Sequence, residues 1–342
     1  LEESGGDGGM MWEIAKLGDI SKNIQTGPFG SQLHQSDYSE CGIPVVMPKD
    51  LVGGKISEES IARVDKTHVE RLCRHKIEVG DILYSRRGDV GRCAHVTKKE
   101  EGWLCGTGCL RVTIDSEKAD SRFVFFQLQH PDTVGWVEKH AVGATMLNLN
   151  TTILSSVPIR LPALEIQKRI ADILSAYDDL IENNQKQIKL LEEAAQRLYK
   201  EWFVDLRFPR HENTRIVDGV PEGWNWCKLE DAIQFDPKVT LTKERMKQFI
   251  PMSALSTSSM VLDESQFTET TSNSGSKFQN GDTLLARITP CLENGKTAYV
   301  SGLKSDEGAV GSTEYIVMRA KTINAYMVYL LERTDDFRQS AI

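Results

Sequence analysis

No run of 18 or more consecutive apolar residues occurs in the 342-residue sequence. A helix needs about 20 such residues to cross the hydrocarbon core of a bilayer, so we expect no membrane-spanning helix. Cysteine is sparse, with seven residues at irregular spacings and no Cys-x-x-Cys pair. An odd number without regular spacing fits reduced thiols better than a disulfide framework, and we therefore expect a cytoplasmic protein.

Sequence motifs of catalysis are missing as well. The chain contains no G-x-G-x-x-G loop, no P-loop lysine, no H-E-x-x-H and no Asn-Pro-Pro-aromatic tetrad of the methyltransferase type. Four residues could bind zinc, although they lack the Cys-x-x-Cys spacing of common zinc sites: Cys93, His95, Cys105 and Cys109. The second half of the chain has no counterparts to these four residues. A metal- or thiol-dependent enzyme is therefore a remote alternative, and we predict no catalytic residue and no metal site.

An excess of basic residues is also lacking, since the formal net charge is −8. Residues 11–160 contain 19 basic and 19 acidic side chains, whereas residues 1–10 are acidic and Gly-rich and are interpreted as a disordered tag or linker. A neutral domain does not bind nucleic acid through its overall charge. Any DNA contact would therefore rest on a local basic face or on basic partner subunits.

The most regular feature of the sequence is an amphipathic stretch in its middle, from Leu164 to Phe203. It contains no Pro and no Gly, and its apolar residues alternate at spacings of three and four, which predicts a coiled-coil helix of roughly 60 Å. Pro162 and Glu165 mark its start, and Pro209 follows its end. The predicted helix interface consists of Ile170, Leu174, Tyr177, Ile181, Asn184, Ile188, Leu191, Ala195, Leu198 and Trp202.

Asn184 is the one residue that interrupts this apolar seam. A single Asn among apolar residues can set the register and the number of helices at some cost in stability. Ile173, Leu180 and Ala194 lie beside the seam and widen the apolar face. The helix could therefore meet more than one partner helix.

The two flanks of the predicted helix are copies of one another. The match GDILYSR (Gly80–Arg86) with GDTLLAR (Gly281–Arg287) predicts a Gly-Asp turn, a short strand ending in Arg, and a Gly-containing loop. An aromatic-rich helical pattern, Phe123–Leu128, returns as Tyr326–Leu331. Four further pairs are spaced by 212 positions: Trp12 and Trp224, Lys16 and Lys228, Leu17 and Leu229, Asp19 and Asp231.

This repeat predicts an α+β fold, with two duplicated mixed α/β domains separated by a long coiled-coil-type helix. We place the first domain at residues 11–160, the helix at 161–208 and the second domain at 209–342. The first copy has a predicted strand, Val157–Leu161, that leads into the helix. No counterpart of that strand precedes Ile342, so we expect the second copy to be incomplete at its C-terminal side.

The order module, long helix, module resembles the DNA-specificity subunits of type I restriction-modification enzymes. The opening VPEGW (Val220–Trp224) and the strand Gly80–Leu83 are similar to signatures of that family. The helix start LPALEIQ (Leu161–Gln167) is similar as well, with Ala163 and Ile166 as departures. The remaining likeness lies in Gly27–Ser31, Asp37-Tyr38, Gly42–Pro44 and Ile170-Ala171.

The resemblance implies a non-catalytic subunit of a methyltransferase and endonuclease complex. Each module would be a target recognition domain for one half of a bipartite site in double-stranded DNA, and the divergent loops of the two copies predict an asymmetric site. The helix would act as a spacer and dock methyltransferase subunits, and a restriction and translocase subunit would join them. S-adenosylmethionine, Mg²⁺ and ATP would bind those partners, so we expect no cofactor here. A second copy of the chain could complete the helix bundle.

Candidate DNA-binding residues of the first module follow from side-chain chemistry. Arg86 and Arg87 can each offer a bidentate fork to guanine or a charge to a phosphate, unless they pair with Asp89. Phe29 could stack on or wedge between bases, although Pro28 and Phe29 could equally be packing residues. The full set is Thr26, Gly27, Phe29, Ser31, Gln32, Ser85, Arg86, Arg87, Lys98 and Lys99, of which Lys98 and Lys99 also fit a solvated turn with Glu100 and Glu101.

The second module offers a parallel set. Arg287 corresponds to Arg86, and Asn294 could read adenine, although Asn294-Gly295 also fits a hairpin turn. The predicted DNA-binding residues are Lys238, Thr240, Lys243, Arg287, Thr289, Asn294 and Lys296, with Thr242 beside them. The alternative function is a coiled-coil scaffold whose duplicated modules bind proteins.

Overall fold

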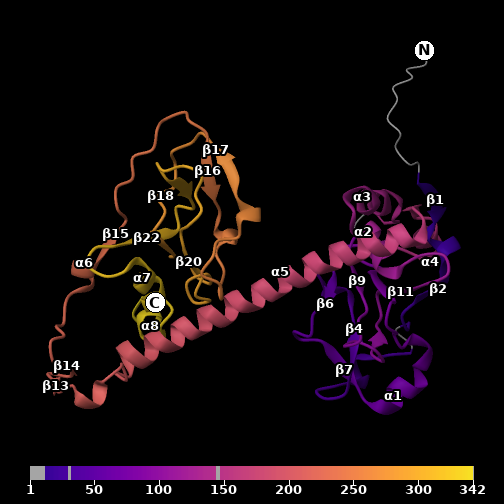
Figure 1. Cartoon of the computed structure of the whole chain (residues 1–342), viewed down its shortest axis with the longest axis horizontal. Helices are drawn as coiled ribbons and strands as arrows, with labels where there is room; N and C mark the ends of the chain where they lie inside the picture. The colour runs from indigo at the N-terminus through magenta and orange to yellow at the C-terminus, as the bar shows by residue number, and fades with distance from the viewer. Residues whose placement is uncertain (1–11, 30–31, 144–146, 342) are drawn as a thin grey trace. The chain divides into compact units, whose positions relative to one another are not determined.

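The computed structural model of the chain describes residues 12–29, 32–143 and 147–341 (Figure 1). The predicted tag at residues 1–10 and the predicted DNA-binding residue Ser31 lie outside these ranges. The chain divides into two compact units, residues 1–180 and 181–342, and helix α5 (Leu164–Tyr199) contributes to both. The predicted α+β class is confirmed, since a sheet-rich part precedes and another follows one long helix in the chain.

The first unit contains two four-stranded sheets. One has the order β2-β11-β8-β9 and the other β10-β4-β7-β3, while β1 pairs with β12 and β5 with β6. The strands are β1 (Glu13–Lys16), β2 (Ser21–Thr26), β3 (Tyr38–Ser39), β4 (Ile43–Val46), β5 (Leu51–Val52), β6 (Lys55–Ile56), β7 (Ala62–Val64), β8 (Ile82–Ser85), β9 (Cys93–His95), β10 (Leu104–Cys105), β11 (Cys109–Ile114) and β12 (Pro158–Leu161). The helices are α1 (Lys66–Arg71), α2 (Ser121–Gln129), α3 (Pro131–His140) and α4 (Thr151–Ser155).

The second unit repeats this plan. Its sheets have the orders β15-β22-β19-β20 and β17-β16-β21-β18, and β13 pairs with β14. The strands are β13 (Ile216–Val217), β14 (Val220–Pro221), β15 (Ile233–Phe235), β16 (Lys247–Ile250), β17 (Thr268–Thr270), β18 (Ser276–Phe278), β19 (Thr283–Ala286), β20 (Thr297–Tyr299), β21 (Ala309–Gly311) and β22 (Tyr315–Ala320). The helices are α6 (Leu229–Ala232), α7 (Ala325–Glu332) and α8 (Asp335–Ala341).

The duplication is therefore visible in the sheet topology. The sheet β2-β11-β8-β9 of the first unit and β15-β22-β19-β20 of the second connect corresponding strands in the same order. In the other sheet, the pair β10–β4 and the pair β21–β16 are both parallel, whereas the remaining pairings are antiparallel. Corresponding strands thus form a parallel pair in both copies, which supports the duplication.

The repeated Gly-Asp motif forms a buried turn ahead of β8 and β19. Gly80 and Gly281 have φ angles of 90° and 93°, a left-handed region in which glycine carries no Cβ penalty. The Asp81 carboxylate accepts a hydrogen bond from the backbone N–H of Glu78 at 2.9 Å, and Asp282 accepts one from Gln279 at 2.8 Å. Burial raises the pKa of Asp81. The most similar motif of the two copies is thus structural.

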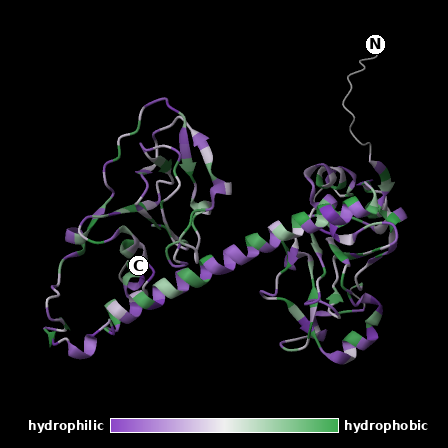
Figure 2. Ribbon diagram, viewed as in Figure 1, coloured by the Kyte–Doolittle hydropathy of each residue, from purple (hydrophilic) through white to green (hydrophobic). Residues whose placement is uncertain are grey.

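The long helix ends slightly earlier as an α-helix than the sequence predicts. Helix α5 spans Leu164–Tyr199, and the next turn, Lys200–Val204, is π-helical, so Trp202 lies beyond the α-helical seam. Most predicted interface residues are solvent-exposed, with side chains such as Tyr177 and Leu191 exposed by 62% and 70%. Figure 2 shows hydrophobic positions recurring along α5 between hydrophilic ones. The apolar seam is therefore a surface of the described chain.

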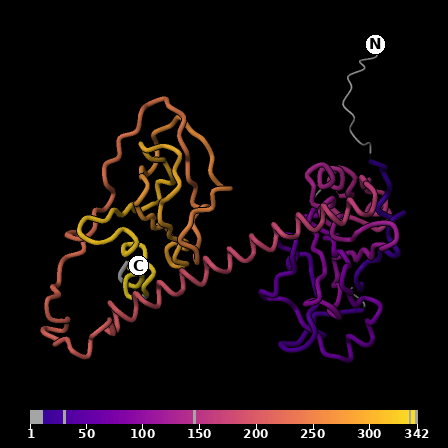
Figure 3. The backbone as a smooth tube through the Cα atoms, in the orientation of Figure 1, coloured from indigo at the N-terminus to yellow at the C-terminus, as the bar shows by residue number. Residues whose placement is uncertain are grey.

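The second unit leaves part of its core open where the first is covered. Leu17 is fully buried, and its backbone N–H donates to the O of Val157, just ahead of β12, at 2.8 Å, but its counterpart Leu229 is 39% exposed. Leu229 lies in an open apolar groove of about 800 Å³ that is also lined by Trp226 and Phe235. Figure 3 traces the connection through residues 205–228 that leads from α5 into this part of the second unit.

Candidate nucleic-acid interface

The two candidate clusters of the first module meet at the start of strand β11. Strand β2 delivers the loop at residues 26–32 to this place, because the N–H of Gly27 donates to Cys109 O at 2.9 Å. Strand β8 delivers Arg86 to the same place, because its N–H donates to Gly108 O at 2.8 Å. Residues 54 or more positions apart in the sequence are therefore neighbours at one end of the sheet β2-β11-β8-β9.

Backbone packing at this sheet end explains the candidate residue Gly27 and its neighbour Pro28. A Cβ on Gly27 would overlap the carbonyl oxygen of Gly106, so glycine is required for close packing at this position. The Thr107 hydroxyl donates to Pro28 O at 2.9 Å and fixes the loop. Gly27 and Pro28 thus shape the loop and leave its contacts with a ligand to neighbouring side chains.

Phe29 is exposed at the surface of this loop, with 54% of the residue accessible to solvent. The Arg86 guanidinium lies over its ring, 6.0 Å from the centroid, in a cation–π contact. Gln32 closes the loop, since its Oε1 accepts from the Phe29 N–H at 3.2 Å and from the Arg74 guanidinium at 3.5 Å. An exposed aromatic ring beside a guanidinium, with a second arginine bonded to the same loop, is suited to stacking and to phosphate binding.

Arg74 is a site residue that the sequence analysis missed. It follows helix α1 and precedes the buried His75, to whose Nε2 it donates at 3.0 Å. Burial, followed by the nearby charges of Arg74 and Arg111, lowers the pKa of His75 to about 4, so this histidine is neutral. The available signal was the basic run between Lys66 and Lys76, which contains four Lys or Arg residues in eleven positions.

Ion pairing separates the arginines of this module into two groups. Within the described ranges, Arg74, Arg86 and Arg87 have no carboxylate partner, and all three border the 26–32 loop or the adjoining strand end. The other arginines between positions 63 and 122 pair with carboxylates: Arg63 with Glu58, Arg71 with Asp37, Arg92 with Asp89, Arg111 with Asp81 and Arg122 with Asp172. Asp89 was the alternative partner of Arg86 or Arg87, but its carboxylate contacts Arg92 instead, at 2.6 Å.

Three of the predicted residues contribute less to this surface. Ser85 is buried, and its hydroxyl donates to Arg87 O at 3.1 Å. Lys98 and Lys99 follow β9 at the opposite end of the sheet from Arg86, because β8 and β9 are antiparallel. Lys98 pairs with Glu101, and Lys99 pairs with Glu58 at 2.7 Å. The solvated-turn interpretation therefore describes their surroundings, and their DNA contact stays a prediction.

The second module places Arg287 at the position of Arg86, with a different electrostatic setting. Its N–H donates to Glu314 O at 2.9 Å, as the N–H of Arg86 does to Gly108 O. The Arg287 guanidinium, however, contacts the Glu314 carboxylate at 3.3 Å. Lys296 Nζ donates to Met252 O at 3.2 Å, which directs it inward. The equivalent sheet ends of the two modules thus present different charge, in line with the expected asymmetry.

Thr289 and Asn294 lie exposed in the loop 287–296 between β19 and β20. The loop contains helical-type bonds, with the Asn294 N–H donating to Pro290 O at 2.9 Å, so Asn294-Gly295 closes a longer turn than a two-residue hairpin. Lys238, Thr240 and Lys243 are exposed on the segment that follows β15. Their DNA contact likewise stays a prediction.

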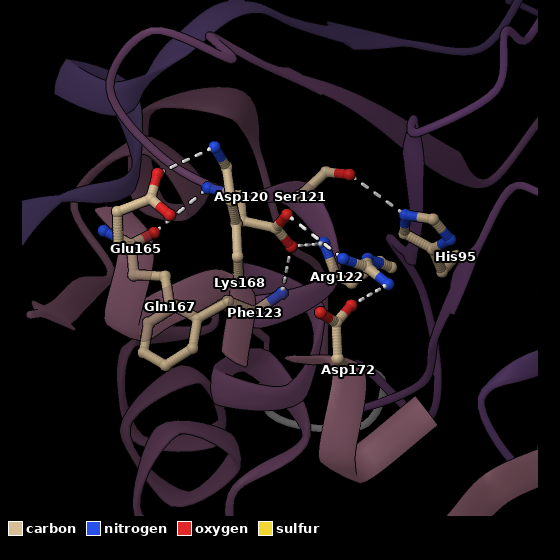
Figure 4. Close-up of polar contacts among 9 residues, drawn as sticks. All are labelled: His95, Asp120, Ser121, Arg122, Phe123, Glu165, Gln167, Lys168 and Asp172. Atoms are coloured by element: carbon tan, nitrogen blue, oxygen red, sulfur yellow. Dashed lines mark hydrogen bonds and ion pairs between the residues drawn. The ribbon is translucent and has the colours of Figure 1, made fainter. Parts of the chain in front are cut away.

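Helix α5 is tied to the first module at its first turns (Figure 4). The buried Gln167 accepts from the Asp120 N–H at 3.0 Å and donates to Pro162 O at 2.8 Å. Asp120 also caps α2, and Arg122 of α2 contacts Asp172 of α5 at 2.8 Å. These bonds fix the direction in which α5 leaves the first module.

The structure also bears on metal and thiol chemistry. Burial raises the pKa of Cys93 and of Cys105 to about 12, so neither is a reactive thiolate. His95 is engaged with the Ser121 hydroxyl at 3.1 Å. Within residues 12–29, 32–143 and 147–341, no three His, Cys, Asp or Glu residues are arranged to hold a metal ion. In the same ranges, no helix is long and apolar enough to cross a membrane.

Comparison with known proteins agrees with the resemblance seen in the sequence. Residues 10–193 match the family described as the type I restriction modification DNA specificity domain. Because this match spans more than half of the chain, the chain belongs to that family.

Named relatives are similar over part of their length. The type I restriction enzyme MjaIX specificity subunit of Methanocaldococcus jannaschii is 28% identical over 233 residues, which is 66% of this chain and 52% of that protein. The HindI specificity subunit of Haemophilus influenzae is 27% identical over 213 residues, which is 61% of this chain and 44% of that protein. The chain thus spans about half the length of the curated relatives it matches.

Solved structures support the fold. A crystal structure of the S subunit of a type I restriction-modification system from M. genitalium has a TM-score of 0.58. The likeness covers 98% of this chain and 80% of that one, at 15% sequence identity. At this identity the comparison supports the fold alone.

Proposed function

We propose that this chain provides the DNA sequence specificity of a type I restriction-modification system. Each module would recognise one half of a bipartite, asymmetric site in double-stranded DNA, with non-specific base pairs between the halves. The observation that carries the proposal is a group of three arginines without a carboxylate partner among the described residues. Arg86 lies over the exposed Phe29 ring, Arg74 donates to Gln32 of the same loop, and Arg87 follows Arg86 in the chain. Uncompensated guanidinium groups at a surface favour phosphates and guanine edges, and they supply the local basic face that a module of zero net charge requires.

The same proposal includes partner subunits. The exposed apolar seam of α5 is a surface of the kind that packs against other helices. Methyltransferase subunits would dock there, a restriction and translocase subunit would join the complex, and a second copy of the chain could also use the seam. We propose that the chain itself is non-catalytic and cytoplasmic, and that S-adenosylmethionine, Mg²⁺ and ATP bind the partner subunits.

The test of this function is sequence-specific DNA binding in the presence of the methyltransferase subunit. The methylation pattern of the host genome, determined with and without this chain, would give both half-sites and the spacer. A purified complex should then bind a duplex with that site, and its affinity should fall steeply with salt. A coiled-coil scaffold for proteins would show neither a changed methylation pattern nor a sequence preference.

The arginine cluster can be tested within the same assay. The double substitution Arg86→Ala and Arg87→Ala should weaken binding by about tenfold or more and lower the salt dependence by about one to two released ions. Arg92→Ala is the matched control, because Arg92 follows in the same loop but pairs with Asp89. Equal losses in the double variant and the control would contradict a special role for Arg86 and Arg87.

A further inference from the structure

The second module is held on helix α5 through Glu192. One carboxylate oxygen of Glu192 accepts from the backbone N–H of Met260 at 2.8 Å and from the Ser259 hydroxyl at 3.3 Å. All three residues are half-buried and belong to the second compact unit. A charged acceptor with a backbone donor is stronger than a neutral pair, so this contact fixes the segment 256–261 against the helix.

The segment 256–261 is bonded in turn to the strand that follows the loop 287–296. The Thr297 N–H donates to Ser256 O at 3.3 Å, and the Tyr299 N–H donates to Met260 O at 3.0 Å. The segment therefore lies alongside β20. Any shift of the segment relative to α5 would move β20 and the loop that precedes it.

Arg333 joins the same segment to the loop itself. Its guanidinium donates to Thr257 O at 2.8 Å and to Gly295 O at 3.1 Å. The group lies over the ring of the buried Tyr329, 5.8 Å from its centroid, which limits its movement. A planar guanidinium can bridge two carbonyl groups in a fixed geometry, which a lysine ammonium cannot do in the same way.

This connection is not a repeated feature of the fold. In the first unit, α5 is fixed by Gln167 and Asp172 to the N-terminal end of α2. In the second unit, the helix residue is Glu192 and its partners lie in the segment 256–261. The second module thus has a connection of its own that runs from α5 to the loop with Thr289 and Asn294.

We propose that Glu192 and Arg333 are positioning residues that hold the predicted DNA-reading loop 287–296 in place on helix α5. They thereby restrict the spacer length that the protein accepts between its two half-sites. This inference rests on the proposed function. A positioning role differs from a general effect on stability. A loop that is no longer held in place would keep its predicted DNA-binding side chains, but it could reach its half-site at several spacer lengths.

The experiment uses the full chain with its methyltransferase subunit and a series of duplexes that contain the methylated site. The spacer of each duplex is shortened or lengthened by one base pair. Wild-type protein should bind the altered spacers about tenfold or more weakly than the natural one. Glu192→Ala and Arg333→Ala should reduce this preference to about threefold or less and change the affinity for the natural spacer by a smaller factor.

Conservative variants and a neighbouring control make the result specific. Glu192→Gln keeps the acceptor oxygen and should retain the wild-type spacer preference, and Arg333→Lys should be intermediate. Glu193→Ala is the matched control, because Glu193 pairs with Arg197 on the helix surface. Equal weakening of binding at every spacer would overturn the positioning role. Wild-type protein without any spacer preference would overturn the proposed function, and with it this inference.

Discussion

At the residue scale, Glu332 is a carboxyl group in the core of the second module, and its protonation affects the stability of that module. The side chain is buried, and burial raises its pKa to about 8. The Thr297 hydroxyl lies 2.8 Å from Leu284 O and 2.5 Å from a Glu332 carboxyl oxygen, and its single hydrogen can serve only one of them at a time. A proton on Glu332 would let both contacts be hydrogen bonds, in line with its raised pKa.

The stability of this module should therefore fall as the pH rises. The folded-state pKa lies above the ordinary value of 4.5, so between about pH 4.5 and 8 the folded state holds a proton that the unfolded state releases. Glu332→Gln keeps the shape and the donor without the charge. Relative to wild type, this variant should stabilise the module more at pH 8 than at pH 5, by on the order of 3 kcal/mol.

Thermal unfolding at pH 5 and pH 8 measures this effect. The wild-type unfolding temperature should drop between the two values more than that of Glu332→Gln. Glu293→Gln is the control, since Glu293 is exposed in the same module. The same drop in wild type and Glu332→Gln would show that Glu332 is charged or solvated.

At the scale of elements, Gln167 connects two helices of the first unit. Its amide accepts from the Asp120 N–H at the start of α2 and donates to Pro162 O ahead of α5. Gln167→Ala would leave both backbone groups without this partner in a buried place. We expect a loss of about 1 to 3 kcal/mol in the free energy of unfolding of the first unit.

Chemical denaturation of the chain can test that loss. Lys168→Ala is a suitable control, since Lys168 is exposed on the same turn and pairs with Glu165. If both variants unfold at the same denaturant concentration as wild type, Gln167 does not hold the helices together. The result would also bear on the family-like LPALEIQ stretch, because Gln167 is its last residue.

The elements themselves were largely predictable from sequence pattern. A seam at spacings of three and four predicts a helix because side chains at those spacings share one face, and α5 follows this pattern from Leu164 to Tyr199. The turn to π-helix at Lys200–Val204 was not predictable, because Trp202 continues the apolar stripe of the preceding helix. The buried Asp81 and Asp282 were recognised as a repeat, but their burial appeared only in the structure.

At the scale of the whole molecule, the two modules share a plan and differ at their candidate DNA surfaces. Arg86 has no carboxylate partner within the described residues, whereas its counterpart Arg287 contacts Glu314. Helix α5 contributes to both units of the chain. Under the proposed function, the spacer between the two half-sites should therefore depend on the length of this helix.

An insertion into α5 tests this dependence. Four added helix-forming residues after the exposed Gln185 add about 6 Å of rise, which is nearly two base pairs of DNA. The methylated site of the host genome should then contain a spacer longer by one or two base pairs with unchanged half-sites. Four residues inserted after Ser272, in an exposed turn of the second module, should leave the spacer unchanged. An unaltered spacer after the α5 insertion would refute the spacer role of the helix.

The sequence by itself determined the duplication, the long helix and the family, because periodicity and repeated motifs are properties of the order of residues. It also placed the candidate loops of the first module correctly within their elements. Only the tertiary structure decided which of these residues share a surface: it joined Phe29 and Arg86, added Arg74, and placed Lys98 and Lys99 at the other end of the sheet. The reason is physical, since strand pairing brings distant residues together, and ion pairing decides which of their charges remain available to DNA.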